Sequence, residues 1–188
     1  MDNSQIIILV VAVIAILAIG AAAWMYMQKK RTERLRSRFG PEYERVVETE
    51  GDRRRAESNL EERQKRVEKL DIRPLSKEDR QRFSQAWTRE QARFVDDPKG
   101  AVAEADRLIG EAMKTRGYPM GDFEQRAADI SVDHPMVVEN YRIAHEIALR
   151  DRRGEADTED LRKAMVHYRA LFEELLENRA VAAKEGRK

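Results

Sequence analysis

The chain opens with an uninterrupted apolar run: residues 6–27 are 22 consecutive residues without a charge, and Lys29, Lys30 and Arg31 follow almost at once. At a helical rise of about 1.5 Å per residue the run is about 33 Å long, whereas the hydrocarbon core of a bilayer is about 30 Å thick. Residues 1–28 are therefore predicted to form an N-terminal transmembrane anchor.

A cleavable signal peptide is the alternative interpretation of this segment. Such a peptide has basic residues before a run of roughly 7 to 15 apolar residues, and a cleavage site made of small residues. Ala21 to Ala23 would suit cleavage, but Asp2 is the only charged side chain before the run, and the run continues to Met27. The sequence favours an uncleaved anchor.

The basic residues predict how the anchor is oriented. Residues 29–41 form a basic juxtamembrane segment, in which residues 29–38 alone carry a net charge of +5. Because Lys and Arg mark the cytoplasmic side, we expect an inner-membrane protein with its N-terminus outside and its C-terminal part in the cytoplasm. Trp24 and Tyr26 lie where an aromatic belt meets the headgroups. The residues expected at the membrane surface, near anionic headgroups, are Lys29, Lys30, Arg31, Arg34, Arg36 and Arg38.

The rest of the charge argues against a nucleic-acid partner. Residues 39–74 and 75–178 carry net charges of −1 and −5, while residues 179–188, which we expect to be a flexible tail, carry +3. A nucleic-acid-binding domain usually concentrates Lys and Arg on its folded surface. The chain also has no cysteine, which excludes disulfides, thiolate metal sites and cysteine nucleophiles.

Residues 42–74 predict a charged helical stalk. Gly40 breaks the preceding helix and Pro41 suits the first turn of a new one, which we expect to run from Glu42 to Leu70. Its apolar positions are too sparse for a strong coiled coil. Weak homo-oligomerisation through the stalk is an alternative, as is association through a stripe of small residues in the anchor, Ala12, Ala15, Ala18 and Ala22.

Residues 75–178 predict a compact helical bundle. Ser76, Asp97 and Asp157 or Thr158 are typical helix caps, and Gly117 and Gly154 are typical helix ends. The segments between them carry apolar residues at helical spacing, with no strand-like alternation. The predicted fold class is all-α: an anchor, a stalk, and a bundle of about four long helices plus one short helix. The last helix has the clearest apolar face: Leu161, Ala164, Met165, Tyr168, Leu171, Phe172, Leu175 and Leu176.

Tests for catalytic and metal-binding motifs fail. His145-Glu146 begins like a zinc protease motif, but Leu149 occupies the position of the second histidine. A calcium loop from Asp151 would need glutamate at its twelfth position, which is Arg162. We therefore expect no enzymatic activity and no catalytic, cofactor-binding or metal-binding residue.

One irregular segment is a candidate for contact with a protein partner, since loops carry function more often than helix interiors. Its apolar and aromatic residues are suited to anchor a partner. The alternative is that they close the end of the bundle. These residues are Tyr118, Pro119, Met120, Phe123, His134 and Pro135.

Several short strings resemble a group of uncharacterised small bacterial proteins that have one N-terminal transmembrane helix and a helical C-terminal region. The resemblance covers most of residues 39–176 and implies a bacterial membrane protein, without implying an activity. The strings are Phe39-Gly40-Pro41-Glu42-Tyr43, Asp71-Ile72-Arg73-Pro74-Leu75, Phe94-Val95-Asp96-Asp97-Pro98, Arg116-Gly117-Tyr118-Pro119-Met120-Gly121-Asp122-Phe123 and Met165-Val166-His167-Tyr168-Arg169.

The function expected from these features is that of a membrane-anchored interaction or scaffolding protein. Its partners are expected to be a bilayer with anionic headgroups and a second protein. Two alternatives remain open. One is a tethered enzyme or ligand-binding domain that uses the segment from Tyr118 to Pro135, and the other is a structural envelope protein whose domain faces outward.

Overall fold

The computed structural model describes residues 3–177, and the side chains of residues 14–177. Within this range the chain forms eight helices and no strand, so the all-α prediction is confirmed. The predicted tail, residues 179–188, and the side chains of the first part of the predicted anchor, residues 1–13, lie outside the described residues. Among the helices as described, none is both long enough and apolar enough to cross a membrane.

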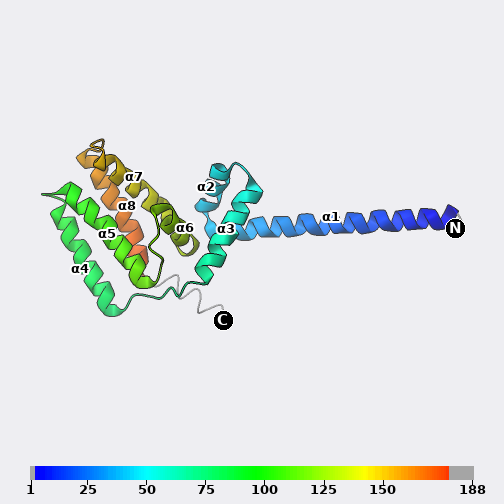
Figure 1. Cartoon of the computed structure of the whole chain (residues 1–188), viewed down its shortest axis with the longest axis horizontal. Helices are drawn as coiled ribbons and strands as arrows, with labels where there is room; N and C mark the ends of the chain where they lie inside the picture. Colours follow the sequence, from blue (N-terminus) through cyan, green and yellow to red (C-terminus); the bar gives the residue numbers. More distant parts are fainter. Residues whose placement is uncertain (1–2, 178–188) are drawn as a thin grey trace.

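Helix α1 (Asn3–Phe39) projects from the rest of the molecule as one long rod (Figure 1). It includes the apolar run and continues without a break through the basic residues. It ends where Gly40 adopts a positive φ of 50°, and Pro41 is the first residue of α2 (Pro41–Glu50). The predicted break at Gly40 and Pro41 is confirmed.

The predicted single stalk helix from Glu42 to Leu70 is wrong, because the segment is divided into α2 and α3 (Arg53–Glu68). Gly51 ends α2 in the left-handed conformation, with φ of 64°, which glycine adopts without a steric penalty. Asp52 then caps α3 by accepting a hydrogen bond from the backbone N–H of Arg55. The glycine and the cap turn the chain back, so that α3 packs against α1 and crosses it in the view of Figure 1.

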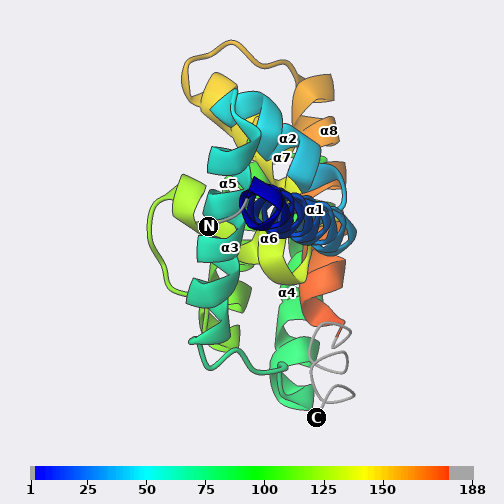
Figure 2. The ribbon, with the colours of Figure 1, turned by 90° about the vertical axis from the view of Figure 1, so that its right-hand side faces the viewer.

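Helices α2 and α3 fold around the end of α1, and we call residues 24–68 the collar. Figure 2 looks almost along α1 and shows its end set among α2, α3 and α6. The collar has an apolar core of its own, to which α6 contributes a single side chain. The core consists of Leu35, Phe39, Tyr43, Val46, Ala56, Leu60, Val67 and, from α6, Val132.

The second part of the molecule is a bundle of four long helices and one short helix, as predicted. The long helices are α4 (Lys77–Arg93), α5 (Pro98–Arg116), α7 (Val138–Arg152) and α8 (Thr158–Leu176), and the short one is α6 (Phe123–Asp133). Helix α8 packs against α5 and α7, and α4 packs against α5. The predicted caps are confirmed, because the side chains of Ser76, Asp97 and Asp157 each accept a hydrogen bond from a backbone N–H in the first turn of the following helix.

The segment between α3 and α4 crosses from the collar to the bundle and is fastened to the end of α5. The backbone N–H of Arg73 donates to the carbonyl of Arg116 at 2.8 Å. Gly117 adopts a φ of 99°, and a Cβ atom there would lie 2.5 Å from the carbonyl oxygen of Asp71. Only glycine fits both the conformation and the close approach, so this connection is a fixed part of the fold.

Candidate functional site

The collar is held together by hydrogen bonds between α1 and α3 just beyond the apolar run. Arg31 donates through Nε and Nη2 to the two carboxylate oxygens of Glu61, each at 2.9 Å. Arg34 donates to the same carboxylate, also at 2.9 Å. A bidentate arginine–carboxylate pair fixes both distance and orientation. The first half of α3 therefore lies directly beside residues 31–34 of α1.

Glu57 is a buried carboxylate at the centre of the collar, only 2% exposed. It accepts hydrogen bonds from the hydroxyls of Thr32 at 2.6 Å and Tyr43 at 3.0 Å, and from Arg53 at 3.3 Å. Burial acts to raise the pKa of Glu57, but these hydrogen bonds outweigh it and lower the pKa below its ordinary value. Glu57 is therefore an ionised member of the core that joins all three helices of the collar.

Glu42 is a second buried carboxylate, and it links the collar to the bundle. Its side chain is 1% exposed and accepts hydrogen bonds from three arginines: Arg45 on α2, Arg63 on α3 and Arg142 on α7. The Arg142 pair is bidentate, at 2.8 and 3.0 Å. Burial acts to raise the pKa of Glu42, but the hydrogen bond from Arg45 and the charges of the arginines lower it overall.

A third link joins α3 to α6. Asp129 is fully buried and accepts a hydrogen bond from Nε of Arg66 at 2.8 Å, as well as from the amide of Gln125. Arg38 lies 3.9 Å from Asp133 in the same region. Ion pairs of Glu42, Asp129 and Asp133, together with Val132, thus fasten the bundle to the collar.

Most of the basic residues expected at the membrane surface take part in ion pairs. Arg38 pairs with Asp133 of α6, whereas Arg31 and Arg34 pair within the collar. Also within the collar, Arg36 lies 2.7 Å from Glu44, and Lys29 lies 3.9 Å from Glu33. Lys30 is exposed. Trp24 and Tyr26 are exposed by 53% and 68%. The pairs show a structural role for the arginines in addition to any contact with lipid.

The structure adds three basic residues that the sequence reasoning missed. Arg53, Arg54 and Arg55 form the exposed start of α3, which returns to the level of Trp24. The guanidinium carbon of Arg54 lies 5.8 Å from the centroid of the Trp24 ring. With these residues, ranges 24–34 and 53–61 carry seven basic and three acidic side chains, a net charge of +4. The signal in the sequence was Gly51-Asp52, which marks a chain reversal.

Two grooves lie along the contact between α1 and α3, and Trp24 and Gln28 line both. The first, the Lys30 groove, has a volume of about 590 Å³ and is lined by Trp24, Met27, Gln28, Lys30, Arg31, Arg34 and Glu61. The second, the Arg53 groove, has a volume of about 360 Å³ and is lined by Trp24, Met25, Gln28, Lys29, Thr32, Arg53, Arg54 and Glu57. In the Lys30 groove the basic residues all come from α1 and α3 contributes only Glu61. In the Arg53 groove α3 contributes Arg53, Arg54 and Glu57, and α1 contributes Lys29.

The irregular segment proposed for partner contact is mostly packed into the bundle. Tyr118 is buried and donates its hydroxyl to Asp133 at 2.9 Å. His134 is also buried, with Nδ1 3.2 Å from a carboxylate oxygen of Glu174, and burial lowers its pKa. Phe123 and Pro135 are half-buried, with Phe123 stacked on the ring of His145. Pro119 and Met120 remain exposed. The structure therefore divides these six residues between the interior and the surface.

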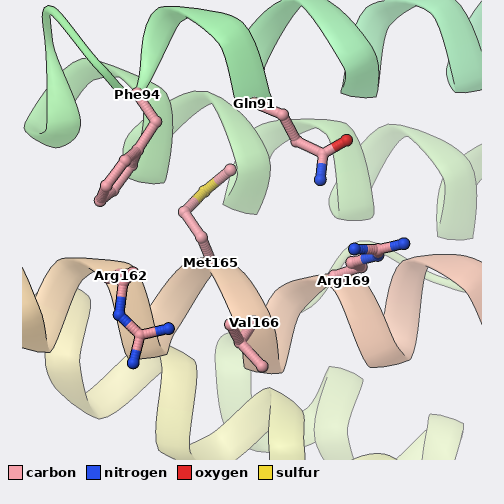
Figure 3. Close-up of a pocket in the computed structure, with 6 residues that line it drawn as sticks. All are labelled: Gln91, Phe94, Arg162, Met165, Val166 and Arg169. Carbon is pink, nitrogen blue, oxygen red and sulfur yellow. The ribbon is translucent and has the colours of Figure 1, made fainter.

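A smaller groove lies on the bundle between α4 and α8, with a volume of about 170 Å³ (Figure 3). Gln91 approaches it from α4 and Phe94 from the position just after α4, and Met165 points into the space between them. Arg162 and Arg169 line it from α8, but each is paired with a glutamate on its own helix. It is large enough for about one apolar side chain.

Histidine and carboxylate side chains do not gather at a metal-like site in the part of the chain that the structure describes. The chemistry available in the collar is instead that of guanidinium and ammonium groups beside an indole ring. Comparison of the chain with protein-family models, with curated proteins and with solved structures finds no match.

Proposed function

We propose that this protein is a single-pass protein of the bacterial inner membrane, whose bundle serves as an interaction or scaffolding module on the cytoplasmic side. The observation that carries the proposal is the position of the collar. Its residues 24–34 and 53–61, which carry a net charge of +4, lie at the end of 22 residues without a charge and include Trp24. A basic surface beside an aromatic residue at the end of an apolar helix is typical of a cytoplasmic membrane interface.

The fixed attachment of the bundle supports a scaffolding role. Because Glu42 and Asp129 bind arginines across the boundary between collar and bundle, the bundle keeps a defined position relative to α1. A flexible stalk would leave its position undefined. A module of this kind presents its surface at a set distance from the membrane.

Exposed apolar side chains on the bundle support the interaction role. Val95 is exposed by 83%, Met136 by 70% and Val166 by 54%. Single exposed apolar residues are ordinary. Val166, however, borders the groove of Figure 3, where Phe94 and Met165 offer adjoining apolar surface.

Membrane extraction tests the anchoring part of the proposal. We expect the full chain to remain in the membrane fraction through washes with high salt and with alkaline carbonate. A matched variant with Ile16→Lys and Leu17→Lys should be released, since a charge at the centre of a membrane helix costs about 2.5–3.5 kcal/mol. The full chain in the soluble fraction would contradict the proposal.

Site-specific photo-crosslinking in intact cells tests the interaction part. A photoreactive residue in place of Val166 should capture a distinct protein, and one in place of Thr115, an exposed residue near the end of α5, should not. The same captured band from both positions, or from neither, would count against an interaction surface at the groove.

A further inference from the structure

The Arg53 groove combines an apolar wall and a basic wall at the end of the apolar run. Trp24 and Met25 belong to the apolar run, Lys29 follows them on α1, and Arg53 and Arg54 line the groove from α3. Trp24 carries an indole N–H, and such amphipathic rings prefer the headgroup region of a bilayer. The groove therefore offers contact both to an acyl chain and to a charged group next to it.

The basic side chains of this groove keep unused hydrogen-bond donors. Arg54 contacts the face of Trp24, and no carboxylate pairs with it among the described residues. Lys29 lies at the long distance of 3.9 Å from Glu33, and both side chains are mostly exposed. In the Lys30 groove, by contrast, Arg31 and Arg34 are both bonded to Glu61. The Arg53 groove is thus the better site for an added anion.

The only acidic residue of the Arg53 groove is unable to serve a positively charged ligand. Glu57 is 2% exposed and already accepts hydrogen bonds from Thr32, Tyr43 and Arg53. Among the residues that line the groove, an ammonium group would meet three cationic side chains and no accessible carboxylate, since the exposed Glu33 lies outside the lining, beside Lys29. This charge pattern favours a phosphodiester with a net negative charge over a zwitterionic headgroup.

We infer that the Arg53 groove binds the headgroup of an anionic phospholipid, with Trp24 packed against its acyl chains. The inference rests on the proposed membrane function, since the lipid must come from the leaflet in which α1 is anchored. Arg54 and Lys29 bind the phosphate, and the adjoining start of α3, with its positive helix dipole, favours the same charge. Such a site would make the collar selective for anionic lipids, beyond the general attraction that any basic surface has for them.

Quenching of Trp24 fluorescence by brominated lipids tests the inference in the full chain. The protein is reconstituted into phosphatidylcholine vesicles that contain a minor fraction of brominated phosphatidylglycerol, or the same fraction of brominated phosphatidylcholine. The chain has two tryptophans, and the signal of Trp87 is measured in a Trp24→Phe variant and subtracted. We expect brominated phosphatidylglycerol to quench Trp24 more strongly than brominated phosphatidylcholine does.

Variants with the same change in charge separate the groove from general surface potential. Arg54→Gln and Lys29→Gln should each reduce the preference for phosphatidylglycerol about fivefold, the effect of one basic residue near a membrane. The control is Arg55→Gln, which removes the same charge one residue away from the groove and should change the preference less. Equal loss in all three variants, or equal quenching by both lipids in the unaltered chain, would overturn the inference.

Two other results of the quenching experiment would contradict the inference in different ways. Competition by soluble glycerol phosphate against phosphatidylglycerol would assign the site to a soluble anion, which overturns the lipid inference. Absence of quenching by either brominated lipid would mean that Trp24 is not in a bilayer, and would contradict the proposed membrane function as well.

Discussion

Among the residues whose side chains are described, the apolar core of the bundle contains 24 buried side chains and that of the collar eight, so the collar needs another source of stability. The buried carboxylates Glu42 and Glu57 supply this stability, since each accepts at least three hydrogen bonds. Ion pairs on the bundle surface, such as Arg162 with Glu159, are more than half exposed at both partners. Surface pairs of this kind contribute little to stability.

The difference teaches that the two regions should respond to different perturbations. Burial of apolar area does not depend on protonation, whereas a buried carboxylate surrounded by arginines stabilises only while it is ionised. Trp24 reports on the collar and Trp87 on the bundle, so each region can be followed separately.

The largest effect is expected from removal of an aromatic side chain in the bundle core. Phe172 is 1% exposed and its ring stacks on that of Trp87, with centroids 4.6 Å apart. Phe172→Ala should lower the free energy of unfolding of the bundle by about 3–5 kcal/mol, because it leaves a cavity. Denaturant unfolding followed by Trp87 fluorescence measures this loss in the free energy of unfolding. Val166→Ala, an exposed change on the same helix, should cost less than about 0.5 kcal/mol, and a similar loss in both variants would contradict the account.

Removal of the Glu42 charge should have the largest effect on the collar. Glu42→Gln leaves Arg45, Arg63 and Arg142 half-buried without their counter-ion. We expect a loss of about 3 kcal/mol in the collar transition, seen by Trp24 fluorescence in denaturant. The matched change Glu44→Gln removes an exposed partner of Arg36 and should cost less than about 1 kcal/mol. Equal costs would show that burial of Glu42 is unimportant.

Acid should open the collar before the bundle. The pKa values of Glu42 and Glu57 lie below their ordinary value of 4.5 in the folded chain, so the unfolded chain binds protons more readily. Their contribution is present above that ordinary value and is lost as the pH falls through the lower folded pKa. Trp24 fluorescence should therefore change at a higher pH than Trp87 fluorescence. Coincident acid transitions would contradict the difference between the two regions.

A smaller effect is expected from two glycines in the same left-handed conformation. Gly51 in the collar has φ of 64° and Gly154 in the bundle has φ of 74°, and an added Cβ would meet no atom within 4 Å at either position. Substitution by alanine should cost about 1 kcal/mol at each, from backbone strain alone. Gly51→Ala should shift the Trp24 transition and Gly154→Ala the Trp87 transition. A shift of both signals in each variant would show that the two regions unfold as one.

The bundle could be predicted from the sequence because its signals are local. Capping residues such as Ser76, Asp97 and Asp157 act within one helical turn, and the apolar faces repeat at helical spacing. Arg116 is the exception in this region. It is fully buried and donates a hydrogen bond to the carbonyl of Leu175. Its burial could not be predicted from the sequence, because it depends on the packing of α5 against α8.

The collar could not be predicted in the same way, because charged residues form part of its interior. Glu42 and Glu57 belong to a pattern typical of a solvent-exposed helix, and their partners lie up to 100 residues away. The basic residues at the end of the apolar run were identified from the sequence. Arg53 and Arg54 were missed, because their place beside Trp24 depends on the reversal at Gly51.

The central claim is that the bundle is held at the cytoplasmic surface of the membrane. Since the chain has no cysteine, a single Val95→Cys change places one thiol on the bundle, at a side chain that is 83% exposed. A Ser4→Cys chain is the control for the opposite side. A membrane-impermeant maleimide applied to intact cells should leave Val95→Cys unlabelled until the cells are permeabilised, and should label Ser4→Cys. Labelling of Val95→Cys in intact cells would contradict the account.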